Sequence, residues 1–294
     1  MIGVDFGGTR IKAGLVQDGK VVSEVACPTR GGAKAILDAI AALVKQLAPQ
    51  PQTVGVAIPG EIDDSGRCWR LPNVKGFAGV KIARELTKRL GCPVAVENDA
   101  TAAALAERRF GHGQRQRSFL LVTLGTGVGG GLCIDGAVRR GRHGFAGEIG
   151  HVLVDGTPNA WRCGCGVRGC MEAYTGTVGL LRKFKALGGK AREVAAVAAA
   201  ARAGKRAGVK TFQHYGHYLG LGLASIQNTL DLDALVFTGG IAGSLDLIEP
   251  SLRKALKQRV FAPPLAEVTI LRSELGDHAG VIGAALLPAI MVNE

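Results

Sequence analysis

The strongest constraint on the fold is a pattern of short apolar runs and glycine turns that occurs twice in the 294 residues. Each copy has an apolar run, a glycine turn, a second apolar run and an Asp-Gly pair. The first copy consists of 2–5, Phe6-Gly7-Gly8-Thr9, 11–16 and Asp18-Gly19, and the second of 119–124, 125–129, 130–134 and Asp135-Gly136. An Asp-Gly pair between apolar runs is a strong hairpin signal. The pattern predicts that each half begins with a meander whose first turn is rich in glycine.

Helical and extended segments alternate after each meander. Apolar residues recur at intervals of three or four between Ile36 and Leu47, as on one face of a helix, and 54–58 is typical of a strand that ends at Pro59-Gly60. Helical stretches follow in the second half at about 177–201, with an expected break at Gly188-Gly189, and at about 209–230. Further strands are expected at 234–237 and 268–271. This alternation predicts an α/β protein of two related lobes with a cleft between them.

Composition favours a globular protein of the cytoplasm. The chain is 47% hydrophobic and 20% charged, and no apolar run reaches the ~20 residues of a membrane span. Residues 1–5 enter a predicted strand at once and lack the basic and apolar regions of a signal peptide. Of seven cysteines, four are scattered, which would risk mispairing in an oxidising compartment. We therefore expect a cytoplasmic protein without a membrane partner.

The net charge of +12 raises the question of nucleic-acid binding. Arginines cluster loosely at 108–117 and at 139–142, but no stacking aromatic residues lie between them and no recognition-helix pattern adjoins them. We expect solvated loops and no nucleic-acid partner. The alternative function of the charge is a field that attracts anionic nucleotides.

A glycine-rich stretch contains one imidazole and three thiols, from His151, Cys163, Cys165 and Cys170. This ligand set suits tetrahedral zinc, and a closed site of four protein ligands is structural rather than catalytic. A disulfide or a group of buried thiols is the alternative, although four soft ligands in one loop favour a metal.

Glycine turns after strands can present backbone N–H groups to phosphates. Asp5 would add a carboxylate that holds Mg²⁺, directly or through water, while an ordinary tight hairpin is the alternative. Asn98-Asp99 lies between a predicted strand and a predicted helix, where α/β sheets often place ligands. A carboxylate there could accept the proton of a substrate hydroxyl during phosphoryl transfer, or simply cap the helix.

Five segments, in this order, closely resemble the ROK family of sugar kinases and sugar-responsive repressors. They are Asp5-Phe6-Gly7-Gly8-Thr9, Glu97-Asn98-Asp99, the glycine run 124–131, the block Glu148 to Glu172 with its Cys-x-Cys-Gly-x-x-Gly-Cys-x-Glu motif, and Thr238-Gly239-Gly240. The resemblance extends from residue 2 to about 285. It implies a two-lobed, actin-like (ribonuclease H-like) ATPase fold, with lobes of 1–117 and 118–277 and a C-terminal helix, about 278–294, that returns to the first lobe.

The resemblance also implies roles for individual residues. Asp99 would be the catalytic base, and the zinc ligands would be His151, Cys163, Cys165 and Cys170. Sugar contacts would come from Gly60, Asn73, Asn98, Asp99, Glu148, His151 and Glu172. Mg-ATP would meet Asp5, Gly7, Gly8, Thr9, Lys12, Thr126, Gly127, Gly239 and Gly240. Arg10 departs from the usual lysine of the family but keeps the positive charge.

The predicted activity is transfer of the γ-phosphate of Mg-ATP to a hexose hydroxyl, with glucose as first choice. Fructose, mannose, N-acetylmannosamine and N-acetylglucosamine are alternatives, and polyphosphate in place of ATP stays open. A repressor of the same family is the rival of another class, but its DNA-binding segment has no room before residue 6, and Asp99 favours catalysis. The family further implies a homodimer.

Overall fold

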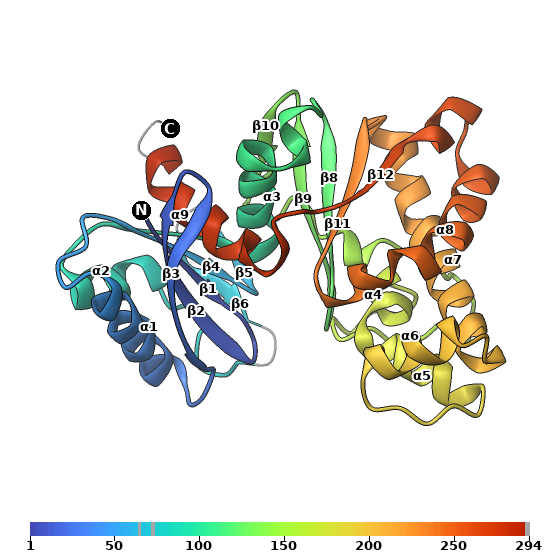
Figure 1. The fold of residues 1–294 in the computed structure, drawn as a ribbon, viewed down its shortest axis with the longest axis horizontal. Coiled ribbons are helices and arrows are strands. Elements are labelled where there is room, and N and C mark those ends of the chain that lie inside the picture. The colour runs from blue at the N-terminus through green and yellow to red at the C-terminus, as the bar shows by residue number, and fades with distance from the viewer. Residues whose placement is uncertain (64–65, 72–73, 292–294) are drawn as a thin grey trace. The chain divides into compact units, whose positions relative to one another are not determined.

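The computed structural model describes residues 1–63, 66–71 and 74–291 as a mixed α/β chain (Figure 1). Two five-stranded sheets and one two-stranded sheet occur in these ranges. The strands are β1 (Ile2–Phe6), β2 (Arg10–Gln17), β3 (Lys20–Pro28), β4 (Val54–Ile58), β5 (Glu61–Ile62), β6 (Cys68–Arg70), β7 (Val94–Asn98), β8 (Phe119–Leu124), β9 (Val128–Ile134), β10 (Ala137–Arg139), β11 (Ala234–Thr238) and β12 (Thr269–Arg272).

The helices lie mostly after the meanders, as the sequence predicts. They are α1 (Ala33–Leu47), α2 (Ile82–Leu90), α3 (Asp99–Phe110), α4 (Met171–Thr175), α5 (Thr177–Ala186), α6 (Val194–Arg202), α7 (Arg206–Leu230), α8 (Leu245–Arg259) and α9 (Ala279–Met291). The expected interruption near Gly188-Gly189 separates α5 from α6. The part of the chain that the structure describes has no helix long and apolar enough to cross a membrane.

The duplicated pattern of the sequence is confirmed by the two large sheets. Their strand orders are β3-β2-β1-β4-β7 and β10-β9-β8-β11-β12, so each has a meander of three strands followed by two later strands. Strands β4 and β7 extend the first sheet in parallel with β1, and β11 pairs with β12 in parallel. Both Asp-Gly turns have positive φ at both residues, as a type I′ hairpin turn requires.

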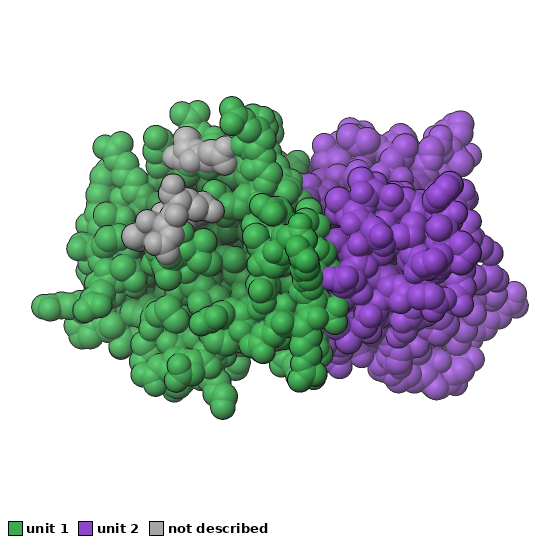
Figure 2. Space-filling model, turned by 90° about the horizontal axis from the view of Figure 1, so that it is seen from above, with its two compact units in different colours: residues 1–121, 131–147, 274–294 green, residues 122–130, 148–273 purple. Residues whose placement is uncertain are grey.

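The chain forms two compact units (Figure 2). Unit 1 comprises residues 1–121, 131–147 and 274–294, and unit 2 comprises 122–130 and 148–273. The predicted lobe boundary at residue 117 stays a prediction.

The core of unit 1 lies around its five-stranded sheet. Apolar residues of β1, β2, β4, α1 and α2 form one buried cluster, and α9 packs on β1, β4 and α3. Gly3 and Gly55 allow this packing, because a Cβ at either position would overlap a backbone carbonyl oxygen of α9, of Val281 or Ala284. The C-terminal helix is thus part of unit 1.

Unit 2 is built largely on α7 and α8, which have many contacts with each other. Phe212, Tyr215, Leu219 and Leu223 of α7 are all buried. The short helix α4 and helix α5 also contact α7. His214 of α7 packs against Trp161, so this layer contacts the glycine-rich loop between residues 151 and 170.

Candidate active site and metal centre

The first glycine turn joins β1 to β2. The Gly7 N–H donates to the carbonyl of Arg10 at 2.9 Å, and Thr29 donates through Oγ1 to the carbonyl of Gly7 at 2.7 Å. Gly8 and Thr9 are exposed at the tip, and nothing lies within 4 Å of where a Cβ of Gly8 would be. The backbone at the tip is therefore exposed, while the two hydrogen bonds of Gly7 hold the base of the turn in place.

Asp5 and Lys12 are cross-strand partners beside this turn. Burial raises the pKa of the Asp5 carboxyl, while the charge of Lys12 opposes that rise. Lys12 Nζ also donates to the carbonyl of Asp277 at 3.2 Å. A divalent cation would favour the charged form of Asp5, so the residue suits the cation-binding role predicted for it.

Asn98 and Asp99 divide two roles at the start of α3. Asn98 caps the helix, because its Oδ1 accepts from the N–H groups of Ala100 at 2.9 Å and Thr101 at 3.1 Å. Its Nδ2 donates to the carbonyl of Gly60 at 3.2 Å. Asp99 is the first residue of the helix, where the helix dipole stabilises a negative charge. The structure thus assigns the cap to Asn98 and brings Gly60 to the same place.

Glu97, directly before this pair, is buried although it is charged. Its Oε1 accepts from the N–H of Asn98 at 2.7 Å, and its Oε2 accepts from Nε of Arg140. The Glu97 side chain is 2% exposed, so the ion pair fixes the end of β7 from inside unit 1.

The second glycine turn, in unit 2, is anchored to α5. The Gly125 carbonyl accepts from N–H and Oγ1 of Thr177, at 3.0 and 2.8 Å. Gly239 has a φ of +90° and lies so close to the carbonyl of Leu124 that a Cβ would overlap it. The turn therefore lies beside the Gly239-Gly240 turn, while Thr126 is exposed at its tip.

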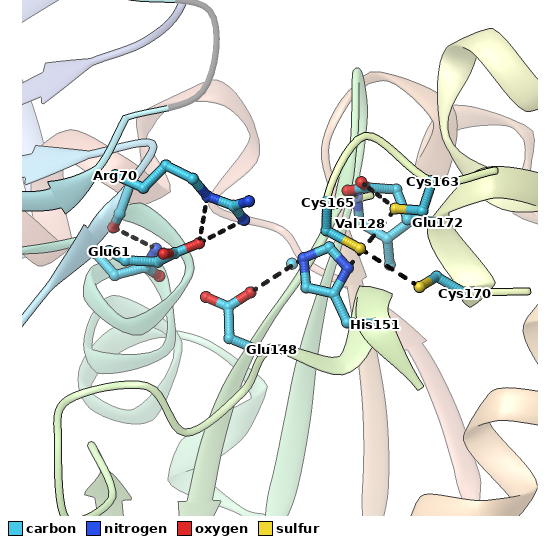
Figure 3. A network of polar contacts seen from close by, with 12 residues as sticks. Glu61, Arg70, Val128, Glu148, His151, Cys163, Cys165, Cys170 and Glu172 are labelled. Atoms are coloured by element: carbon cyan, nitrogen blue, oxygen red, sulfur yellow. Dashed lines mark hydrogen bonds and ion pairs between the residues drawn. The ribbon is translucent and has the colours of Figure 1, made fainter. Parts of the chain in front are cut away.

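The predicted zinc ligands meet in unit 2. The ligand atoms of His151, Cys163, Cys165 and Cys170 all lie within 4.8 Å of one another (Figure 3). The Sγ atoms of Cys165 and Cys170 are 3.7 Å apart, and Cys163 Sγ is 3.8 Å from His151 Nδ1. Zinc–sulfur bonds of about 2.3 Å at tetrahedral angles separate two sulfur atoms by ~3.8 Å, whereas a disulfide needs about 2.05 Å. The geometry fits zinc and is too wide for a disulfide.

Burial affects the protonation of the cysteine thiols. It raises the pKa of Cys163 to about 12 and also raises the pKa of Cys170. A zinc ion bound to these thiols would stabilise the thiolates and oppose this rise.

His151 connects the cluster to Glu148. Its Nδ1 faces the cysteines, and its Nε2 lies 3.8 Å from Oε2 of Glu148, whose side chain is 41% exposed (Figure 3). A carboxylate near the second ring nitrogen orients a metal-bound histidine. Glu148 can thus orient the His151 ring while part of its side chain faces solvent.

Glu172 lies between the metal cluster and the second glycine turn (Figure 3). Its Oε2 accepts from the N–H of Val128 at 3.0 Å, and Cys163 Sγ donates to its Oε1 at 3.5 Å. The sequence predicts a sugar contact for Glu172. The structure adds a structural role, because the carboxylate ties the cysteine loop to the turn that contains Thr126 and Gly127.

Known proteins of similar sequence and structure identify the family of this chain. The family model described as "ROK family" matches residues 1–289. The chain belongs to the ROK family. It is 34% identical to a glucokinase of Streptomyces coelicolor over 97% of this chain and 96% of that one, and 32% identical to an N-acetyl-D-glucosamine kinase of Vibrio cholerae over 97% and 98%. The crystal structure of a ROK family glucokinase from Streptomyces griseus in complex with glucose and AMPPNP is similar with a TM-score of 0.84, 36% identity and 97% of both chains covered.

ROK membership confirms the resemblance and the fold class predicted from the sequence. The protein has the two-lobed, actin-like ATPase fold of the ROK glucokinases. The individual residue roles stay predictions. Asn73, one of the predicted sugar contacts, lies outside the described residues.

Two features near the predicted site of this ROK protein were not predicted from the sequence. The roles of Glu97 and Arg140 were not predicted, although a charged residue in the apolar strand 94–98 is a usable signal for a buried ion pair. The arginine clusters are partly structural. Arg108 donates to the carbonyls of Gly136 and Gly113, and Arg117 pairs with Asp135.

Proposed function

We propose that this protein transfers the γ-phosphoryl group of Mg-ATP to a hydroxyl of a hexose, with glucose as the first candidate. ROK membership and full-length similarity to glucokinases support the class of ATP-dependent hexokinase-type phosphotransferases. Similarity to an N-acetylglucosamine kinase keeps the amino sugars as alternatives, together with fructose and mannose.

Asp99 carries the proposal as the general base. Its carboxylate stands on the first residue of α3, while Asn98 caps the helix beside it. In the proposed step, Asp99 accepts the proton of the sugar hydroxyl as the sugar oxygen bonds to the γ-phosphorus and ADP leaves. Positioning and charge neutralisation supply most of the catalysis in such reactions.

The proposed nucleotide contacts come from the glycine turns and from residues beside the first of them. The exposed tips at Gly7, Gly8 and Thr9 and at Thr126 and Gly127 can donate N–H groups to phosphates, with Lys12 near the first tip. Gly239 and Gly240 would face the adenosine. Mg²⁺, held by Asp5 directly or through water, would neutralise charge on the phosphates.

The sugar would be held by Asn98, Glu148, His151 and Glu172, with Gly60 and Asn73 as further lining. Zinc on His151 and the three cysteines would brace the loop that carries these side chains and would take no part in the chemical step. A homodimer and a cytoplasmic location stay predictions. The cytoplasmic location is expected because four scattered cysteines would risk mispairing in an oxidising compartment.

A coupled kinase assay over a panel of hexoses and amino sugars tests the proposal. We expect phosphorylation of at least one sugar, and Asp99→Asn should lower kcat by about a thousandfold with sugar and ATP binding retained in calorimetry. Asp38→Asn, an exposed carboxylate of α1, is the matched control and should keep full activity. Retained turnover in Asp99→Ala removes the base assignment, and an inactive wild-type protein overturns the kinase proposal.

A further inference from the structure

Two neighbouring aromatic rings lie in unit 1 and are not among the residues predicted to contact sugar or ATP. Trp69 of β6 is 65% exposed, and its ring centroid lies 6.0 Å from that of the half-buried Phe145, with the ring planes 37° apart. We call these two rings the aromatic pair. Water solvates apolar rings poorly, so an exposed pair of rings favours contact with a ligand or a partner.

The side chain of Trp69 points away from the core because of its place in β6. Cys68, directly before it, is buried in the apolar cluster of unit 1, and successive side chains of a strand lie on opposite faces. The strand is held by β5, in which Glu61 is the cross-strand partner of Arg70. Nε and Nη2 of Arg70 both donate to Oε1 of Glu61, at 3.1 and 2.7 Å (Figure 3). Trp69 therefore projects from a braced strand.

Phe145 is held by the packing of its own loop. The Ala146 N–H donates to the carbonyl of Arg140 at 2.9 Å. Gly144 has a φ of +81° and lies so close to the carbonyl of Ile62 in β5 that a Cβ would overlap it. Both rings thus stand on backbone that packs against β5, and the aromatic pair is organised before any ligand binds.

The aromatic pair adjoins two predicted sugar contacts that belong to the same unit. The carbonyl of Arg70, the residue after Trp69, lies so close to Gly60 that a Cβ at Gly60 would overlap it. The Gly60 carbonyl accepts from Nδ2 of Asn98, which directly precedes Asp99. Packed backbone segments therefore connect Trp69 to the proposed catalytic base within unit 1.

A sugar ring is the ligand whose chemistry fits the aromatic pair. A hexose ring carries hydroxyl groups at its edge and C–H groups on its faces, and the predicted polar contacts can bind only the hydroxyl groups. The C–H groups bind an apolar surface, and the electron-rich face of an aromatic ring attracts their hydrogens. A protein partner fits poorly, because a stable interface buries about 800 Å² on each side, far more than two rings provide.

We propose that Trp69, supported by Phe145, stacks on the C–H face of the sugar ring and is a further specificity-determining contact of the proposed kinase. This inference rests on the proposed kinase function. The aromatic pair selects sugars with a closed pyranose ring over open-chain polyols, which have similar hydroxyl groups but no ring face. The ring face takes no part in bond formation, so the contact stabilises the bound sugar and the transition state equally. It therefore acts on the KM for the sugar and not on kcat.

Steady-state kinetics of Trp69 variants test the inference. We expect Trp69→Ala to raise the KM for the sugar by about tenfold, because one stacked ring is lost, with kcat and the KM for ATP changed by less than about threefold. Trp69→Phe keeps an aromatic face and should stay within about threefold of the wild-type KM. The control is Phe261→Ala, which removes a ring that is 92% exposed in unit 2 and should change none of these constants.

Tryptophan fluorescence tests the contact without ATP. The chain has two tryptophans, Trp69 and Trp161. Glucose, mannose, fructose and N-acetylglucosamine are each titrated into the wild-type protein and into Trp69→Phe, with sorbitol as the open-chain control. We expect at least one of the four sugars to change the wild-type emission, and we expect this change to be lost in Trp69→Phe. Sorbitol should change neither protein.

Each other outcome has a distinct meaning. Transfer by the wild-type protein with an unchanged sugar KM in Trp69→Ala overturns the contact and leaves the kinase proposal intact. Equal rises in the KM for sugar and for ATP, or a fluorescence change that persists in Trp69→Phe, also overturn the contact. No transfer to any sugar overturns the kinase proposal, and a sugar-dependent change that needs Trp69 would then still support the contact. If no sugar changes the emission, the contact is overturned as well.

Discussion

Arg140 and Glu97 form an ion pair inside unit 1, with Nε of Arg140 donating to Oε2 of the carboxylate. The Glu97 side chain is 2% exposed and the Arg140 side chain 27% exposed. Because Glu97 also accepts from the N–H of Asn98, the pair holds the backbone directly before Asp99. Residues 131–147 of unit 1, which include Arg140, thus help to fix the strand end that precedes the proposed catalytic base.

Removal of Arg140 should destabilise the protein and impair catalysis. Arg140→Ala leaves a buried carboxylate without this partner, and we expect a loss of about 3 kcal/mol in the free energy of unfolding. Displacement of Asp99 should lower kcat by about tenfold. Urea unfolding and steady-state kinetics measure both effects. Arg202→Ala removes an exposed pair and should cost less than about 1 kcal/mol, and an Arg140→Ala protein as stable as that control contradicts the prediction.

The metal centre predicts about one zinc ion per chain. Cys165→Ser should abolish the metal and raise the KM for the sugar by about tenfold or more, because the loop with Glu148 and His151 loses its brace. Elemental analysis of gently purified protein measures the metal. Cys92→Ser, a buried cysteine outside the cluster, should retain it. Wild-type protein that contains no metal would falsify the assignment.

Glu172 should affect both substrates of the proposed reaction. Glu172→Gln replaces a carboxylate that faces Val128 N–H and Cys163 Sγ, so the second glycine turn should lose part of its support. We expect the KM for ATP and the KM for the sugar each to rise by about tenfold, the loss of one charge-assisted hydrogen bond. Kinetics with each substrate varied in turn measure this, with zinc content as the control. An unchanged KM for ATP would show that Glu172 affects sugar binding and not ATP binding.

His214 predicts a loss of stability in mild acid. It packs against Trp161, Tyr174 and Tyr218, and burial, with smaller effects from Lys183 and His217, lowers the pKa of His214 to about 4. A histidine in the unfolded chain has a pKa of about 6.5. Between about pH 6.5 and 4, His214 is therefore mostly protonated in the unfolded state and mostly neutral in the folded state. Stability contributed by neutral His214 is complete above pH 6.5 and falls between about pH 6.5 and 4, by less than about 1.4 kcal/mol per pH unit.

Urea unfolding at several pH values measures the effect of His214. In His214→Gln the free energy of unfolding should fall less steeply over this range than in the wild-type protein. Identical slopes for His214→Gln and the wild-type protein would show that other groups, such as the thiol ligands, cause the acid sensitivity.

Local patterns explain why much of the fold could be predicted. The Asp18-Gly19 and Asp135-Gly136 turns, the break between α5 and α6 and the strand 54–58 depend on residues adjacent in the sequence, and the structure confirms each of them. The comparisons also confirm the predicted family and enzyme class. The local rules gave no information on contacts between distant segments.

The sequence by itself determined the two glycine turns, the family and the set of four predicted zinc ligands, because each is encoded in a short stretch or in the order of such stretches. Only the tertiary structure decided which side chains from distant parts of the sequence contact each other. Glu97 is 43 residues from Arg140, Glu172 is 44 residues from Val128, and Arg182 lies over Trp161. The energetic effect of a charged side chain depends on the groups that surround it. Folding sets these surroundings, because it brings together segments that are far apart in the sequence.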